Sequence, residues 1–150
     1  MGRDWQSSIG NFYGSTLVRL RPEDTLAPTL AFVAALAVYD ALKEVAPQFD
    51  LLIKWPNDIY VDDQKICGML IENQVKNGTI SSTVLGIGLN VNQIDFEGLE
   101  AISIRQVNGE FSSMKEIAVS LCSRIENRID EYSRLGIENL RKQYLSRLYQ

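Results

Sequence analysis

An Asn-Gly pair at Asn77 and Gly78 is the feature that most constrains the fold of this chain. Asn-Gly favours the two-residue turn whose left-handed backbone matches the twist of a β-hairpin. Residues 68–75 precede the pair and residues 80–90 follow it, and both segments have the composition of strands. We therefore expect them to be neighbouring antiparallel strands of one sheet.

Further strands are predicted on both sides of this hairpin along the chain. Residues 11–20 alternate loosely between apolar and polar side chains, and residues 51–55 are a short apolar run that stops at a proline. Residues 59–61 should pair with residues 65–71 across the turn at residues 62–64. The expected sheet is mixed and largely antiparallel.

A long apolar helix is predicted between the first two strands. Thr25 is a suitable N-cap, Pro28 is tolerated in the first turn, and Pro47 ends the helix. The segment between them is rich in Ala, Leu and Val on almost every side. This pattern is typical of a helix that is buried at the centre of a domain.

Two more helices are predicted after an irregular segment at residues 93–110. Ser113 and Glu116 have the spacing of a capping box, and Gly136 is a candidate C-cap between the helices. The first helix should bury a stripe formed by Ile117, Leu121, Ile125 and Ile129. Its other face is expected to be solvated and carries Arg124, Glu126, Arg128, Asp130 and Glu131. The last helix should turn inward Leu140, Tyr144, Leu145 and Leu148. The order of elements predicts an α+β fold with helices against one face of the sheet.

Length and charge narrow the class of protein. A chain of 150 residues is expected to form one domain. The net charge of −4 argues against a general nucleic-acid binder, which usually has a basic face. No run of 18 apolar residues predicts a membrane span, and the polar N-terminus is unlike a signal peptide. Cytoplasm is the expected compartment.

The side chains that are present also limit the chemistry. The sequence has no histidine, which excludes imidazole bases, Ser-His and Cys-His nucleophiles and histidine metal sites. Its two cysteines, Cys67 and Cys122, lie far apart in apolar segments and are expected to be buried free thiols. Any catalysis must therefore use Lys, Arg, Asp, Glu, Asn and backbone groups.

The segment Lys54-Trp55-Pro56-Asn57-Asp58 is the first candidate site. It presents a cation, an indole, an amide and a carboxylate at the end of an apolar strand. Pro56 cannot continue a sheet ladder, and Asn57 and Asp58 favour a turn. Ligands gather at strand ends in open α/β sheets, so this segment is a site candidate on its own residues.

The same segment resembles the Lys-Trp-Pro-Asn-Asp signature of the biotin–protein ligases. Residues 65–72, Lys-Ile-Cys-Gly-Met-Leu-Ile-Glu, and residues 86–92, Gly-Ile-Gly-Leu-Asn-Val-Asn, resemble two further blocks of that family in the same order. Gly2-Arg3-Asp4-Trp5 and Gly10-Asn11-Phe12-Tyr13 resemble the end of its Gly/Arg-rich loop and the strand after it. The resemblance covers roughly residues 2–145 and implies a fold like that of class II aminoacyl-tRNA synthetases and biotin synthetases.

The resemblance implies a two-step reaction. Biotin and ATP-Mg²⁺ would give biotinyl-AMP, and the acyl group would then pass to a lysine of a biotin carboxyl carrier protein. Carboxylate adenylation suits a chain without histidine, because the attacking carboxylate is already ionised at pH 7. The enzyme must supply mainly alignment and charge neutralisation.

The resemblance also implies roles for individual residues on the early motifs. Lys65 would contact the biotinyl carboxyl and the α-phosphate, although a lysine there could equally be a solvated hairpin residue. Arg3 would belong to the loop over the adenylate, and Trp5 would pack near the adenine. Lys54 would face the ATP phosphates or simply lie beside Trp55 with its ammonium in water.

The remaining candidates line the nucleotide and the biotin ring. Asn57 would bind the nucleotide, and Asp58 would either stabilise its turn or anchor Mg²⁺ through water. Gly68 would line the biotin ring, or mark a bulge. Gly86 and Gly88 would leave room for the adenosine. Asn90 would bind the adenine or, alternatively, cap a turn.

The chain departs from the family pattern at its start, because Met1 stands midway through the Gly/Arg-rich loop. We therefore expect residues 1–150 to be a catalytic domain that is incomplete at the N-terminus, without a DNA-binding domain or a C-terminal barrel. A nucleotide-binding or dimer-forming remnant without activity, and a lipoate-type ligase, are the alternatives. A repressor is disfavoured by the acidic charge. An exposed sheet edge would favour a homodimer.

Overall fold

The long hairpin predicted from Asn77 and Gly78 is the centre of the sheet. In the computed structural model, which describes residues 9–19 and 29–149, β4 (Gln64–Lys76) turns directly into β5 (Thr79–Leu89). The two strands pair antiparallel from Cys67 opposite Leu89 to Lys76 opposite Thr79. Asn77 and Gly78 have φ values of 52° and 77°, as the expected turn requires.

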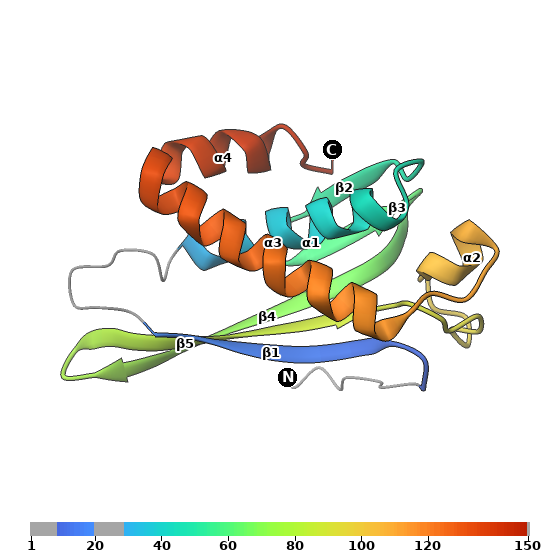
Figure 1. Ribbon diagram of the computed structural model, residues 1–150, viewed down its shortest axis with the longest axis horizontal. Coiled ribbons are helices and arrows are strands. Elements are labelled where there is room, and N and C mark those ends of the chain that lie inside the picture. The colour runs from blue at the N-terminus through green and yellow to red at the C-terminus, as the bar shows by residue number, and fades with distance from the viewer. Residues whose placement is uncertain (1–8, 20–28, 150) are drawn as a thin grey trace.

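Three shorter strands extend this hairpin into a five-stranded sheet of order β1-β5-β4-β3-β2 (Figure 1). β1 (Phe12–Arg19) pairs with β5, and β3 (Asp58–Val61) pairs with β4 across the predicted turn. β2 (Leu51–Lys54) follows at the edge. Every pairing between these strands is antiparallel, so the expected largely antiparallel sheet is confirmed.

The helices cover one face of the sheet, as predicted. Figure 1 shows α1 (Leu30–Val45), α3 (Met114–Leu135) and α4 (Ile137–Leu145) on the same side. α1 is buried on most sides, as its all-round apolar sequence predicts. The structure gives its N-cap as Thr29, and the predicted start at Thr25 and Pro28 lies outside the described residues. None of the described helices is long and apolar enough to cross a membrane.

A short helix within the expected irregular segment corrects the prediction for residues 93–110. α2 (Ile104–Asn108) begins at Ser103, whose hydroxyl accepts from the backbone N–H of Gln106. The Gln106 side chain in turn accepts from the backbone N–H of Ser103, 3.0 Å away, which completes a capping box. The Ser-x-x-Gln spacing carried this signal, but the helix has only one and a half turns and no apolar stripe to support it.

The stripe of α3 is confirmed, and its solvated face is confirmed in part, because Glu126 and Asp130 are exposed. Ile117, Leu121 and Ile125 are buried, and Ser113 accepts from the backbone N–H of Glu116 at 3.4 Å. Arg128 was expected in solvent, and this is wrong, because the residue is only 8% exposed. α1 and α4 both lie beside α3, so this guanidinium donates to the Asp40 carboxylate of α1 and to the side-chain oxygen of Gln143 of α4 instead of to water.

The end of the chain packs against the edge of the sheet. Leu140 and Tyr144 of α4 are buried as predicted, and Leu148 is half-buried beside Ile53 of β2. The backbone N–H of Ile53 donates to the carbonyl of Arg147 at 2.8 Å, so residues 147–149 bridge β2 in parallel. Leu145 was predicted to turn inward and is instead 50% exposed, because one residue after Tyr144 the helix points in another direction.

The two cysteines differ in burial. Cys67 lies in the core, and burial raises the pKa of its thiol. Cys122 was expected to be buried, and this is wrong, because it lies on an exposed side of α3 next to the buried Leu121. Neither forms a disulfide.

Candidate functional site

The sheet face opposite the helices carries a row with one residue from each strand. The residues in register across it are Tyr13 on β1, Gly88 on β5, Gly68 on β4, Asp58 on β3 and Lys54 on β2. The neighbouring row, which contains Leu89, Cys67, Ile59 and Ile53, is buried under the helices. Successive residues of a strand point to opposite faces, so the first row faces away from the core. We call it the site row.

Two glycines form the middle of the site row. Gly68 and Gly88 are direct cross-strand partners, which leaves the backbone of β4 and β5 without side chains at that point. An aromatic ring stands at one end of the row, and the charged pair Asp58 and Lys54 stands at the other. This arrangement permits a flat ligand to approach the backbone closely with charged groups beside it.

A β-bulge brings Lys65 onto the same face. The register between β3 and β4 shifts, since Ile59 faces Cys67 but Tyr60 faces Lys65, which leaves Ile66 as the extra residue. In a regular strand Lys65 and Gly68 would point to opposite faces, because they are three residues apart. The bulge removes this mismatch and directs the Lys65 side chain toward Gly68 and Asp58.

Lys65 and Asp58 form an ion pair over Gly68. The ammonium Nζ lies 2.8 Å from Oδ1 of Asp58, and the two side chains are 38% and 19% exposed. A Cβ at position 68 would come within 3.0 Å of the Lys65 Nζ and 3.1 Å of its Cε. Gly68 therefore provides the space in which this lysine lies, and it is not itself the bulged residue.

Lys54 lies against two aromatic rings. Its Nζ is 4.5 Å from the ring centroid of Tyr60 and 5.4 Å from that of Tyr149. The Tyr149 hydroxyl donates to Asp63, and this contact raises the pKa of the phenol. Trp55, beside which Lys54 was expected to lie, is itself 73% exposed. Neither tyrosine is among the predicted site residues, and only Tyr60, two residues after Asp58 on the same face of β3, carries a sequence signal.

Two predicted ligand-binding asparagines hold the backbone in this structure. The Asn57 amide donates to the carbonyl of Met69, and the backbone N–H of Met69 donates to the Asn57 carbonyl at 2.8 Å. The Asn90 amide donates to the carbonyl of Lys65 at 3.2 Å. Their predicted contacts with the nucleotide stay predictions.

The other predicted residues fall at the margin of the row or outside the described chain. Gly86 lies two rows away on the same face, between Ser15 and Leu70, and a Cβ there would meet Leu70 at an ordinary 3.6 Å. Arg3 and Trp5 lie outside the described residues. The described ranges contain no cluster of three or more His, Cys, Asp or Glu side chains that could hold a metal ion.

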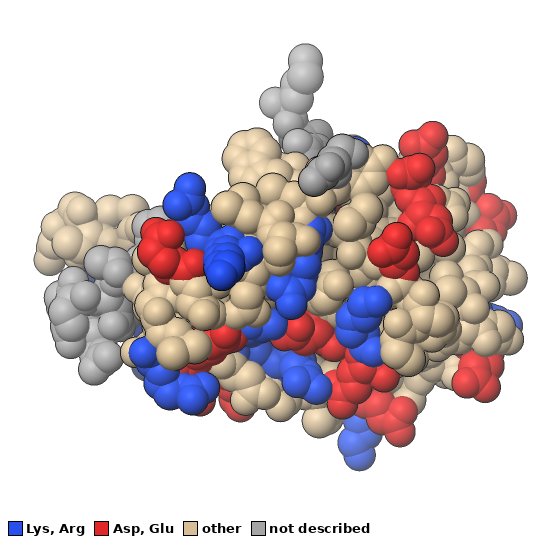
Figure 2. All heavy atoms as spheres, turned by 90° about the horizontal axis from the view of Figure 1, so that it is seen from above, with Lys and Arg blue, Asp and Glu red and all other residues tan. Residues whose placement is uncertain are grey.

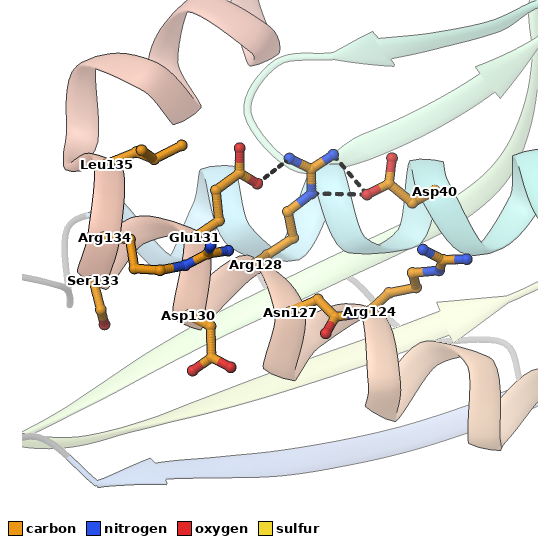
Figure 3. A pocket seen from close by; sticks show the side chains of 9 residues that line it. All are labelled: Asp40, Arg124, Asn127, Arg128, Asp130, Glu131, Ser133, Arg134 and Leu135. Carbon is orange, nitrogen blue, oxygen red and sulfur yellow. Dashed lines mark hydrogen bonds and ion pairs between the residues drawn. The ribbon is translucent and has the colours of Figure 1, made fainter.

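A cavity of the described chain lies elsewhere, in the helix layer. It measures about 560 Å³ and is lined by Asp40 of α1 and a series of α3 residues (Figure 3). Its walls are acidic and basic side chains in similar number, and Arg128 already pairs with Asp40 and Glu131 there. Basic and acidic residues are also interspersed on the helix face in Figure 2. The site row, which holds the sequence motifs, is the stronger candidate.

Comparison with known sequences points to one family. Residues 1–90 match the family model described as "Biotin/lipoate A/B protein ligase family". The chain is 40% identical over 91 residues to a biotin–[acetyl-CoA-carboxylase] ligase of Paracoccus denitrificans, covering 60% of this chain and 38% of that protein. It is 38% identical over 133 residues to the bifunctional ligase/repressor BirA of Bacillus subtilis, covering 87% of this chain and 36% of that protein.

Solved structures agree with the sequence matches. A biotin protein ligase from Aquifex aeolicus in complex with biotin and ATP superposes with a TM-score of 0.82 and 27% identity. The alignment covers 98% of this chain and 62% of that one. A biotin protein ligase from Leishmania major in complex with biotinyl-5-AMP has the same fold, with a TM-score of 0.80. In the sequence comparisons, the matched part of the chain spans less than two fifths of the length of the Paracoccus denitrificans and Bacillus subtilis proteins.

Proposed function

Because the chain belongs to the biotin/lipoate A/B protein ligase family, we propose that it activates biotin with ATP and transfers the biotinyl group to a lysine of a carrier protein. The substrates are biotin and ATP, and the acceptor is a biotin carboxyl carrier protein or domain. The names of relatives such as the Paracoccus denitrificans biotin–[acetyl-CoA-carboxylase] ligase and the Bacillus subtilis ligase/repressor support biotin within a family whose description also includes lipoate.

One observation carries the proposal. Three sequence blocks that are separate along the chain meet at one point of the site row, where Lys65 lies above Gly68 and beside Asp58. Gly88, from the third block, is the cross-strand neighbour of Gly68. A half-exposed ammonium beside a glycine floor is suited to bind a ligand that carries developing negative charge.

In the first step, a carboxylate oxygen of biotin attacks the α-phosphorus of ATP, and pyrophosphate leaves. Lys65 stabilises the negative charge on the carboxylate and α-phosphate oxygens, and Asp58 keeps its ammonium in place. Lys54, at the end of the same row, faces the phosphates. In the second step the neutral ε-amine of the carrier lysine attacks the acyl carbon, AMP leaves, and the amine loses a proton.

Mg²⁺ would neutralise part of the phosphate charge when it is bound with ATP. Mg²⁺ is commonly held by one or two carboxylates together with the substrate phosphates, and Asp58 is the one carboxylate of the site row. Its Oδ1 pairs with Lys65, so the second oxygen would hold the ion, through water. This fits the donor set available on the row.

Formation of biotinyl-AMP tests the proposal. The chain is incubated with biotin, ATP and Mg²⁺, and the product is quantified by mass spectrometry. Lys65→Ala should lower the rate by about 100-fold or more, because one preorganised charge is lost from the transition state. Lys76→Ala, at the exposed end of β4, is the matched control and should keep the rate.

The alternatives give different results in the same assay. A folded chain that binds ATP but forms no biotinyl-AMP would be a nucleotide-binding remnant. Faster turnover of lipoate or octanoate than of biotin would indicate a lipoate-type ligase. Product that persists in Lys65→Ala would contradict the role given to Lys65.

A further inference from the structure

Lys65 is held through its backbone as well as through its ammonium group. Its carbonyl accepts two hydrogen bonds, one from the Asn90 side chain at 3.2 Å and one from the backbone N–H of Ile102 at 3.0 Å. Its own N–H donates to the carbonyl of Glu100 at 2.9 Å. Residues 100–102 thus bridge the start of β4 in parallel, while Asn90 comes from the end of β5.

Asn90 also contacts the extra residue of the bulge. Its backbone N–H donates to the carbonyl of Ile66 at 2.9 Å. Asn90 therefore binds the carbonyls of Lys65 and Ile66, the two residues at which the register shifts. A bulge interrupts the ladder locally, and buried backbone groups that lose their regular partners need others.

We propose that Asn90 is a positioning residue for Lys65. It holds the bulge by binding the Lys65 carbonyl through its side-chain amide and the Ile66 carbonyl through its backbone N–H. The inference rests on the proposed function for the role of Lys65. If the bulge relaxed to a regular register, the Lys65 side chain would turn toward the opposite face and leave Asp58 and Gly68. The Asn90 amide thus determines where the ammonium lies, although Asn90 need not touch the reacting atoms.

Asn90→Asp is the most direct variant. A carboxylate has the size of the amide but no N–H to donate, and it repels the Lys65 carbonyl. The value of kcat for biotinyl-AMP formation should fall about tenfold or more, because a displaced catalytic group is costly, while KM for ATP and for biotin should stay within about threefold. A residue that reads the adenine would instead raise KM for ATP selectively.

A second measurement needs no activity. Hydrogen–deuterium exchange should become faster at the amides of Lys65 and Ile102 in Asn90→Asp, and stay unchanged at the hairpin tip around Gly78. The rate at which an acylating reagent labels Lys65, relative to Lys54, should also change. Asn73→Asp is the control, since Asn73 accepts from Thr83 through its side-chain oxygen, at 2.7 Å, and Asp retains that oxygen.

These outcomes separate the inference from the proposed function. A chain that never forms biotinyl-AMP contradicts the proposed function, while exchange and labelling still test the position of Lys65. Unchanged exchange and labelling in Asn90→Asp, or a higher KM for ATP with unchanged kcat, would overturn the inference.

Discussion

At the scale of single residues, the site depends on Gly68 because Lys65 occupies the space that a side chain would fill. The Lys65 Nζ lies 3.0 Å from the place of a Cβ at that position, and the nearest oxygen of Asp58 lies 3.4 Å from it. Glycine in the interior of a strand usually weakens a sheet. Here it leaves room for an ion pair on the ligand face.

Gly68→Ala should therefore displace Lys65 from Asp58 without unfolding the domain. The clash falls on the end of a flexible side chain, which can move, so we expect a loss of stability of about 1 kcal/mol or less. Biotinyl-AMP formation should fall about tenfold or more, as for a misplaced catalytic group. Urea denaturation and the mass-spectrometric assay measure the two effects.

Glu72→Ala is the control for this substitution, because Glu72 is exposed and lies on the same strand and face, four residues further on. It should leave the rate of product formation unchanged. A Gly68→Ala variant with full activity would show that the position of Lys65 in this structure is not needed for the reaction.

At the scale of elements, Arg128 holds three helices together. Its guanidinium lies 2.6 Å from Asp40 of α1 and 2.5 Å from Glu131 of α3, and it donates to Gln143 of α4 at 2.8 Å (Figure 3 shows the two carboxylates). The Arg128 side chain is only 10% exposed. An ion pair at this depth is screened less by water than a surface pair.

Arg128→Ala should lower the free energy of unfolding by about 2 kcal/mol or more, since it leaves two half-buried carboxylates without their cation. The exposed pair of Arg141 and Glu138, with 3.5 Å between its nearest atoms, is the matched control. Arg141→Ala should change stability by less than about 0.5 kcal/mol. Urea denaturation of both variants measures the difference, and equal losses would contradict the central role of Arg128.

The bridge between residues 147–149 and β2 should weaken at alkaline pH. The hydrogen bond from Tyr149 to Asp63, and the negative charge of that carboxylate, raise the pKa of the phenol. The folded chain therefore binds this proton more tightly than the unfolded chain does. The resulting stability is fully present below the unfolded pKa of about 10 and is lost as the pH rises through the higher folded value.

Tyr149→Phe should remove this contribution. Its urea midpoint should lie below that of the unchanged chain at pH 8, and the gap should narrow as the pH rises above about 10 and the phenol of the unfolded chain ionises. The other tyrosines titrate in both proteins, so their effect on the urea midpoint cancels in the difference between the two. A gap that stays constant over this range would contradict a pKa raised by Asp63.

At the scale of the whole molecule, the helices cover one face of the sheet (Figure 1). The register and the burial of the neighbouring row place the site row on the other face. The core residues of the sheet form one buried cluster with α1, while the alternate residues of the strands point away from the helices. A ligand that binds this face only in the folded chain must stabilise the whole domain by mass action.

Biotin together with ATP should therefore raise the unfolding midpoint. At a free concentration of about 100 times Kd, the stabilisation is about 2.7 kcal/mol for one site. Thermal or urea denaturation with each substrate alone and with both measures it, and lipoate serves as the matched comparison. No shift with biotin and ATP, in a chain that unfolds cooperatively, would contradict a binding site on this face.

Local sequence signals were sufficient for most of the fold. Asn77 and Gly78 fixed the hairpin because few dipeptides adopt that turn, and the apolar patterns of α1 and α3 showed which sides are buried. The three motifs also identified Lys54, Asp58, Lys65 and Gly68 as candidates. Turn chemistry and periodicity depend on neighbours in the chain, so the sequence alone determined them.

The tertiary structure decided what depends on distant partners. Arg128 is buried because the carboxylate of Asp40, 88 residues away on α1, binds its guanidinium, and Lys54 faces a ring from the far end of the chain. The bulge that directs Lys65 to Asp58 is stabilised by Asn90 and by residues 100–102. Such contacts join segments separated by 24 residues or more, and no periodic pattern in the sequence encodes them.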